Sequence, residues 1–120
     1  KGTVVIVDDS ALIRRTLRDL VEGAGYTVVA EGANGAEGLE AYKEYRPDLI
    51  TLDITMPEMD GVEALEKIME FDSAAKVVMI TAAGQQQKVI KALRVGASKF
   101  IMKPFNREEV IAALQEIIKR

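Results

Sequence analysis

Short runs of β-branched and other apolar residues alternate with segments of helical periodicity along the whole chain. Five such runs occur, at residues 3–7, 26–30, 49–52, 77–80 and 99–102. Three of them are nearly continuous Val, Ile, Leu and Met, which is typical of parallel strands that helices cover on both faces. The run at 26–30 is weaker and fits an edge strand. A β-α unit repeated five times favours a doubly wound, three-layer α/β/α fold around one parallel sheet.

The segments between these runs carry apolar residues three or four positions apart, which is the spacing of an amphipathic helix. Ser10 or Asp9 is expected to cap the first helix, Asp60 the third and Asn106 the fifth, because short polar side chains bind the free N–H groups of a first turn. The apolar stripe of the fourth helix is expected at Val89, Ile90 and Leu93.

The composition of the chain excludes several classes of function. The 120 residues, 48% hydrophobic and 29% charged, suffice for a single domain over residues 1–120. The net charge of −3 gives nucleic acid no electrostatic reason to bind. No apolar stretch approaches ~18 residues, and no signal-peptide pattern is present. We therefore expect no membrane contact and a cytoplasmic location.

Cysteine and histidine are both absent from the sequence. Their absence excludes disulfides, thiolate or imidazole metal ligands and thiol or imidazole catalysis, and the chain cannot phosphorylate itself on histidine. A bound metal ion would therefore be a hard cation held by oxygen atoms.

Polar side chains follow four of the apolar runs, at the point where each predicted strand ends. Asp8 and Asp9 follow the first run, Asp53 the third, Thr81 the fourth and Lys103 the fifth. The carboxyl ends of parallel strands share one edge of a sheet, so these side chains are expected to converge. Two carboxylates ~5 Å apart repel by about 3 kcal/mol at an effective dielectric near 20. A cation in the cluster would offset that repulsion, and Mg²⁺ suits oxygen ligands best.

The set of side chains at this edge suits phosphoryl transfer. Asp53 would be the nucleophile, Mg²⁺ and Lys103 would neutralise charge on the phosphoryl oxygens, and Thr81 would donate a hydrogen bond. Each residue also has a simpler interpretation when it is taken alone. Asp8 and Asp9 could form a strand exit and a helix cap, Asp53 could cap a loop, and Lys103 could be a solvated surface lysine.

Four stretches of the chain resemble the receiver domains of response regulators: residues 5–10, 52–61, 81–82 and 103–105. They occur in the order and spacing of that family, and the match covers the whole chain. The closest resemblance is to single-domain chemotaxis regulators of the CheY type. It implies the flavodoxin-like strand order 2-1-3-4-5 and one receiver domain over residues 1–120. It also favours a cis bond between Lys103 and Pro104 more than an ordinary X-Pro bond, which is cis in ~5% of cases, would.

The resemblance also implies roles for the residues at the strand ends. Asp53 would accept a phosphoryl group from the phosphohistidine of a kinase. Asp9, Asp53 and the backbone carbonyl of Thr55 would hold Mg²⁺ directly, and Asp8 would act mainly through water. Lys103 would contact the phosphoryl group. The domain would catalyse its own phosphorylation and slow dephosphorylation without being a turnover enzyme.

Four further positions carry expectations about switching and phosphate lifetime. Thr81 would swing toward the phosphoryl group, and the ring of Phe100 would rotate inward. Many relatives have tyrosine where this chain has Phe100, so a signal that needs the tyrosine hydroxyl is absent here. Thr55 and Ala83 tune phosphate lifetime in the family. Neither supplies a charge or a carboxamide to orient water, so the phosphoryl group is expected not to be unusually short-lived by its own hydrolysis.

Partner binding is expected on the surface of the fourth helix, fifth strand and fifth helix, with contacts at Lys88, Lys91, Phe100 and Met102. The expected partners are a histidine kinase of the CheA type and a downstream effector such as a flagellar motor switch protein. No nucleic-acid partner is expected for this domain alone, and a monomer is expected.

Alternative interpretations remain open from the sequence alone. Residues 8–15 also resemble the receiver half of chemotaxis methylesterases, so the chain could be a receiver taken from a multidomain regulator, or an engineered one. A haloacid-dehalogenase-type phosphatase needs a second acid where this chain has Thr55. A flavodoxin would place a flavin phosphate against Asp8 and Asp9, and the chain has no tryptophan to stack on the ring. A degenerate receiver would lack the intact set of acids, threonine and lysine.

Two short clusters carry weaker expectations. Gly32, Gly35 and Gly38 lack the spacing of a dinucleotide-binding loop and indicate a turn and a helix start. The triplet 85–87, three consecutive glutamines, is expected to be a solvated helix start.

Overall fold

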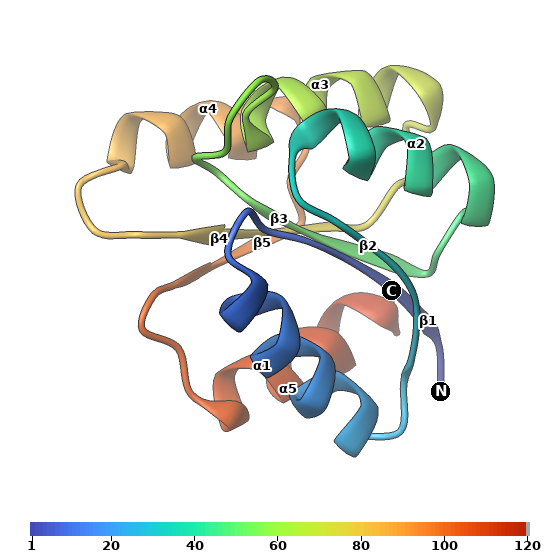
Figure 1. The fold of residues 1–120 in the computed structure, drawn as a ribbon. Coiled ribbons are helices and arrows are strands. Elements are labelled where there is room, and N and C mark those ends of the chain that lie inside the picture. Colours follow the sequence, from blue (N-terminus) through green and yellow to red (C-terminus); the bar gives the residue numbers. More distant parts are fainter. Residues whose placement is uncertain (120) are drawn as a thin grey trace.

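The protein is described by a computed structural model that covers residues 1–119. Five parallel strands form one sheet in the order β2-β1-β3-β4-β5, with five helices around it (Figure 1). The strands are β1 (Thr3–Val7), β2 (Thr27–Gly32), β3 (Leu49–Asp53), β4 (Val77–Thr81) and β5 (Lys99–Met102). The helices are α1 (Ala11–Gly23), α2 (Gly35–Tyr45), α3 (Gly61–Phe71), α4 (Gln86–Val95) and α5 (Arg107–Ile118). The predicted fold class and strand order are confirmed.

The sheet separates two hydrophobic cores. Helices α2, α3 and α4 cover one face, and α1 and α5 cover the other (Figure 1). Alternate residues of β1 serve the two cores: Val5 and Val7 face the first, and Val4 and Ile6 face the second. β3 and β4 are buried at every position. This two-sided burial explains their continuous apolar sequence.

Strands β3 and β4 run one residue further than the apolar runs predict. Asp53 pairs with Ile80, and Thr81 pairs with Met102, so both polar residues belong to the sheet ladder. The ladder continues because backbone N–H and C=O groups pair whatever the side chain is. β2 also differs from its prediction, since it begins at Thr27 and continues to Gly32 beside Val7.

Side chains cap four of the helices at their N-termini. The oxygens of Ser10, Asn34, Asp60 and Asn106 each accept a hydrogen bond from a backbone N–H in the first turn of the helix that follows. Three of these caps were predicted, and Ser10 rather than Asp9 caps α1. Helix α4 differs, because its N-cap residue, Gln85, makes no side-chain capping bond.

Two glycines allow the backbone to pack closely around the loop that follows β3. A Cβ on Gly61 would lie 2.1 Å from the carbonyl oxygen of Asp53. A Cβ on Gly35 would lie 2.4 Å from the carbonyl oxygen of Met59, whose oxygen already accepts the Gly35 N–H at 2.9 Å. Only a hydrogen fits at either site, so the start of α3 and the start of α2 lie directly against this loop. The predicted turn and helix start at Gly32–Gly35–Gly38 is confirmed.

The peptide bond between Lys103 and Pro104 is cis, as the resemblance implies. Within residues 1–119, no helix has the length and apolar character needed to cross a membrane.

Candidate functional site

Three carboxylates meet at the carboxyl ends of two neighbouring strands. Asp8 directly follows β1, and Asp53 is the last residue of β3, which pairs with β1. One oxygen from each of Asp8, Asp9 and Asp53 lies within 4.8 Å of the others. Asp8 and Asp53 are buried, whereas Asp9 is exposed. The structure therefore brings together all three acids that the strand-end pattern singled out, in what we call the acidic pocket.

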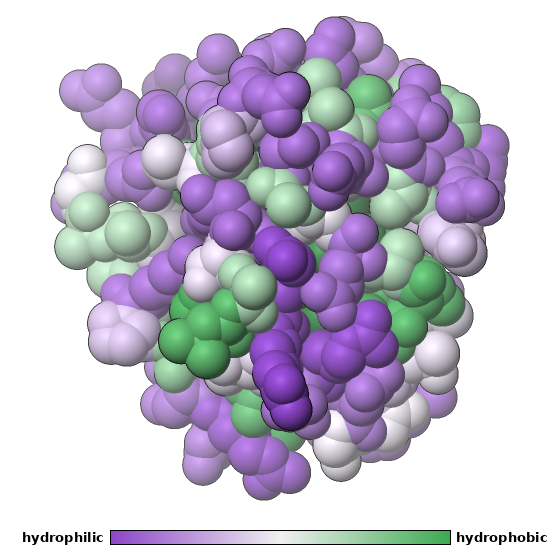
Figure 2. Space-filling model, in the orientation of Figure 1, coloured by the Kyte–Doolittle hydropathy of each residue, from purple (hydrophilic) through white to green (hydrophobic). Residues whose placement is uncertain are grey.

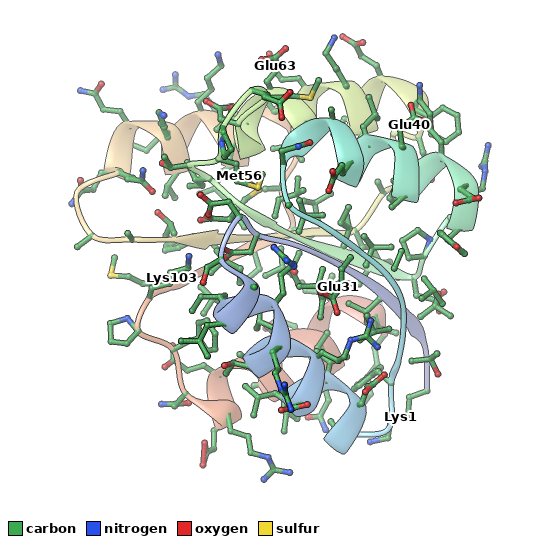
Figure 3. The ribbon with its side chains drawn as sticks, in the orientation of Figure 1. Lys1, Glu31, Glu40, Met56, Glu63 and Lys103 are labelled. Atoms are coloured by element: carbon green, nitrogen blue, oxygen red, sulfur yellow. The ribbon has the colours of Figure 1, made fainter. Side chains whose placement is uncertain are left out.

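Lys103 brings a positive charge into the acidic pocket from the far edge of the sheet (Figure 3). Its ammonium Nζ lies 3.1 Å from Oδ2 of Asp8 and 3.4 Å from Oδ1 of Asp53. The Lys103 backbone N–H donates to the Thr81 carbonyl at 2.6 Å, so the lysine is anchored to β4. One ammonium neutralises one of the three carboxylates, and the pocket keeps a negative charge.

The electrostatic balance of the pocket is visible in the pKa of Asp53. This pKa is raised to about 6, because burial and the nearby Asp8 charge raise it by more than the Lys103 ammonium lowers it. Burial alone would lower the pKa of Lys103, but its bonds with Asp8 and Asp53 outweigh that effect and raise it. Ionised Asp53 is therefore held at a free-energy cost that additional positive charge would relieve.

The pocket has oxygen atoms free to bind a cation. Oδ1 of Asp8 accepts the Ser10 N–H at 2.9 Å. Oδ2 of Asp8 is buried and accepts no well-aligned hydrogen bond from residues 1–119, although the Lys103 ammonium lies beside it. A buried, unsatisfied carboxylate oxygen is costly. Together with Asp9 and Asp53 it provides only oxygen donors, which fits a hard divalent cation.

The Gln85 side chain links two threonine hydroxyls beside the pocket. Its Nε2 donates to Oγ1 of Thr55, and its Oε1 accepts from Oγ1 of Thr81 at 3.2 Å. The Thr81 hydroxyl also lies 3.1 Å from the Ala82 carbonyl oxygen. The prediction of a fully solvated glutamine cluster is wrong for Gln85, which is half-buried because its side chain turns back toward the strand ends.

Sequence reasoning missed Gln85 because its role depends on a bend in the chain. Gly84 has a φ of 89°, a left-handed conformation that suits glycine and redirects the chain before α4. The available signal in the sequence was Gly84 followed by Gln85, because glutamine is not a favoured N-cap residue and its side chain is free to bind elsewhere. Ala83, the other predicted lifetime position, lies exposed in the same loop.

An apolar groove of about 310 Å³ extends from Thr81 along α4 and β5. Thr81 and Gln85 are among the residues that line the groove. Its apolar walls include Val89, Ile90, Leu93, Phe100 and Met102. The last four of these are 40–49% exposed. Sequence periodicity placed Ile90 and Leu93 in a buried stripe, and that prediction is wrong, since only Val89 and Ala92 of α4 are buried.

Lys88 and Lys91 lie on another side of α4 from this groove. The Nζ of Lys88 is 3.7 Å from Asp60, and the Nζ of Lys91 is 4.0 Å from Glu66 on α3. The two lysines therefore form a seam between α3 and α4. Of the four residues predicted for the partner surface, the structure groups Phe100 and Met102 with the groove.

A hydrophobic patch lies on the other side of the pocket. Figure 2 shows it near the start of α1, on a face that is otherwise mostly hydrophilic. Leu12, in the first turn of α1 and three residues after Asp9, is 73% exposed. A single exposed aliphatic side chain is ordinary on a protein surface and does not by itself mark an interface.

Residues 4–115 match the family described as the response regulator receiver domain, and the chain belongs to that family. It is 48% identical over 116 residues to the chemotaxis protein CheY of Thermotoga maritima, covering 97% of both chains. It is 47% identical over 115 residues to CheY of Bacillus subtilis, covering 96% of both. A solved CheX–CheY complex with BeF₃ and Mg²⁺ from Borrelia burgdorferi contains a chain with a TM-score of 0.91 and 40% identity, with 96% of this chain and 87% of that chain covered.

These relatives separate the alternatives. A methylesterase of Archaeoglobus fulgidus is 39% identical, and the match covers 98% of this chain but 34% of that protein. The chain resembles whole CheY proteins more strongly than this receiver half, so the excised-receiver interpretation is not favoured. Membership in the family makes the chain a phosphorylation-switched domain of two-component signalling, acting between a histidine kinase and a downstream effector. The phosphatase and flavodoxin alternatives are set aside.

Proposed function

We propose that this protein is a chemotaxis-type response regulator that receives a phosphoryl group on Asp53. The observation that carries the proposal is the geometry of Asp53, which lies 3.4 Å from the Lys103 ammonium and within 4.8 Å of the Asp8 and Asp9 oxygens. An Asp53 carboxylate oxygen attacks phosphorus, the bond from phosphorus to the kinase's imidazole nitrogen breaks, and the imidazole leaves as a neutral group once it carries a proton.

Mg²⁺ is the cation that we propose for the acidic pocket. Asp9 and Asp53 would hold it directly with the Thr55 backbone carbonyl, and Asp8 would act mainly through water. When bound, Mg²⁺ supplies positive charge that offsets repulsion between the carboxylates and the incoming phosphoryl oxygens. The chain's own contribution is to orient those oxygen donors, two of which are fixed by the ends of β1 and β3.

Lys103 and Thr81 stabilise the transferred group in this proposal. Lys103 places its ammonium against the phosphoryl oxygens and keeps the strand ends together. Thr81 rotates so that its hydroxyl donates to one of those oxygens. Phe100 responds by turning its ring toward the space beside Thr81, and the groove changes shape.

The groove along α4 and β5 is where we propose that the downstream effector binds. Its exposed apolar side chains suit an amphipathic segment of a partner such as a flagellar motor switch protein. The phosphoryl donor that we propose is the phosphohistidine domain of a CheA-like histidine kinase. A location in the cytoplasm, a monomeric state and one receiver domain over residues 1–120 complete the proposal.

Thr55 and Ala83 offer no charged group to hasten hydrolysis of the phosphoryl group, which supports a phosphate lifetime that is not unusually short.

Incubation with acetyl phosphate and Mg²⁺, followed by intact-mass measurement, tests this function. Wild type should gain the mass of one phosphoryl group, and Asp53→Asn should gain none, because the amide is not a nucleophile. Asp19→Asn, an exposed acid on α1, is the matched control and should behave as wild type. Phosphorylation of the Asp53→Asn variant to the wild-type extent would overturn the proposal.

A further inference from the structure

The Thr81 hydroxyl has one proton and several possible acceptors. In the structure its neighbours are Oε1 of Gln85 at 3.2 Å and the Ala82 carbonyl oxygen at 3.1 Å. Thr81 is buried, with 1% of its surface exposed, so water competes little for this proton. While the proton is donated to Gln85 or Ala82, the hydroxyl has none to give to an oxygen attached to Asp53.

Gln85 is held in place from its other end. Its Nε2 donates to Oγ1 of Thr55, two residues after Asp53, so one carboxamide spans from the loop after β3 to the end of β4. Both ends of the amide are therefore engaged by the site rather than by the helix.

The position of Gln85 in the helix supports a role in the site. Gln85 is the N-cap residue of α4 and makes no side-chain capping bond, whereas α1, α2, α3 and α5 each have one. Its carboxamide is used between the two threonines instead. Gln85 and Thr81 both line the apolar groove, so a change in their contact reaches the proposed effector surface.

We propose that Gln85 is a positioning residue that holds Thr81 in the unphosphorylated orientation and releases it when Asp53 is phosphorylated. This inference rests on the proposed function, because it needs Thr81 to bond the phosphoryl group. The latch opposes phosphorylation by one hydrogen bond, and its release separates Gln85, at the start of α4, from the hydroxyl at the end of β4.

The first test measures the affinity for beryllofluoride, a phosphoryl mimic, by calorimetry with Mg²⁺ present. Gln85→Ala removes one of the two competing acceptors and leaves the Ala82 carbonyl, and the variant should bind beryllofluoride about three- to tenfold more tightly, as expected for one net hydrogen bond. Thr55→Val, which removes the anchor, should shift the affinity in the same direction. Gln87, an exposed residue in the first turn of α4, is the control position, and Gln87→Ala should match wild type. Affinity that is unchanged or weaker in Gln85→Ala would overturn the latch.

A double substitution separates a latch from a general effect on folding. In a Thr81→Ala background the Gln85→Ala substitution should leave beryllofluoride affinity unchanged, because there is no hydroxyl to hold. A gain that persists without the Thr81 hydroxyl would contradict the proposal.

A metal-free measurement distinguishes failure of the latch from failure of the proposed function. The ¹³C shift of the Thr81 γ-methyl reports the side-chain rotamer of this residue. It should move toward a rotamer-averaged value in metal-free Gln85→Ala and stay fixed in Gln87→Ala. An unmoved signal would refute the latch even if wild type binds beryllofluoride. If wild type takes up no beryllofluoride, the proposed function fails, and the switching role of Gln85 falls with it.

Discussion

Helices α3 and α4 are adjacent and nearly equal in length, yet they are attached to the sheet in different ways. α3 buries five residues, has Asp60 as a side-chain cap and begins with Gly61 pressed against the Asp53 backbone. α4 buries Val89 and Ala92 and has no side-chain cap. Asp53, the proposed nucleophile, is therefore backed by a firmly packed helix, and the proposed output surface lies on a less buried one. This arrangement suits a switch. The pocket around Asp53 must keep its geometry, which requires tight packing, whereas the surface of α4 must move, which requires looser packing.

Leucine truncation in the two helices should give the largest contrast. Leu65 on α3 is fully buried, and Leu93 on α4 is 43% exposed. Leu65→Ala should lower the free energy of unfolding by about 3 kcal/mol through lost burial and a cavity. Leu93→Ala should lower it by less than about 1 kcal/mol. Urea unfolding of both variants measures the difference, and similar costs would remove the basis of the comparison.

Adding a methyl group at the start of each helix tests the backbone contacts. Gly61→Ala would bring a Cβ within 2.1 Å of the Asp53 carbonyl oxygen and should cost about 3 kcal/mol. Gly84→Ala, before α4, has open space around it but a φ of 89°, so it should cost about 1 kcal/mol. Thermal and urea unfolding provide the measurement. A Gly61→Ala protein as stable as Gly84→Ala would contradict the lock on the Asp53 backbone.

The buried carboxyl group of Asp53, next to α3, should make the stability of the metal-free protein depend on pH. Burial raises the pKa of Asp53 from 3.8 to about 6, so between pH 4 and pH 6 the folded state keeps a proton that the unfolded state has lost. Stability should therefore fall as pH rises through that window, by on the order of 3 kcal/mol, and level off above it. Urea unfolding across pH 4–7 measures the slope.

Three comparisons isolate that effect. Asp53→Asn should lack this part of the slope. At pH 7, millimolar Mg²⁺ or Asp9→Asn should raise the melting temperature of the metal-free protein by relieving repulsion. Identical pH profiles for wild type and Asp53→Asn would show that the pocket is less strained than its geometry indicates.

Helix caps should give the smallest contrast. Asp60→Ala removes the hydrogen bond to the Glu63 N–H, which is 2.9 Å long, and should cost about 1 kcal/mol. Asp60→Asn keeps the cap and loses the ion pair with Lys88, so it serves as the control and should stay close to wild type. Gln85→Ala removes no cap but loses the bonds to Thr81 and Thr55, and should cost about 0.7 kcal/mol. Denaturant midpoints compare the three, and a larger loss for Gln85→Ala than for Asp60→Ala would reverse the ranking.

The sequence predicted the α/β layers and the acidic pocket because both follow from local rules, whereas the strand order was implied by the resemblance to receiver domains. Continuous apolar runs identify covered parallel strands, and the carboxyl ends of such strands share an edge, so Asp8, Asp53 and Lys103 converge. Ser10, Asp60 and Asn106 were identified as caps for an equally local reason, because each stands directly before its own helix.

Features that depend on neighbouring elements were not predictable in this way. Ile90 and Leu93 follow the same helical spacing as buried residues, but no layer covers that side of α4 within residues 1–119. The orientation of Lys88 and Lys91 is set by acids on α3. Gln85 reaches the site only because Gly84 bends the chain, and the close contact at Gly61 requires knowledge of where the β3 backbone runs.

The ion pairs of the seam between α3 and α4 are expected to be more sensitive to dissolved salt than the ion pairs of the acidic pocket. Its pairs, Lys88 with Asp60 and Lys91 with Glu66, are 3.7 and 4.0 Å long and join side chains that are 36–61% exposed. Screening in 1 M salt acts over ~3 Å, so ions weaken such pairs readily, although each pair is worth little. Lys103 meets carboxylates that are 0% and 7% exposed, where ions penetrate poorly. Concentrated salt should therefore loosen α4 while the charged contacts around Asp53 persist.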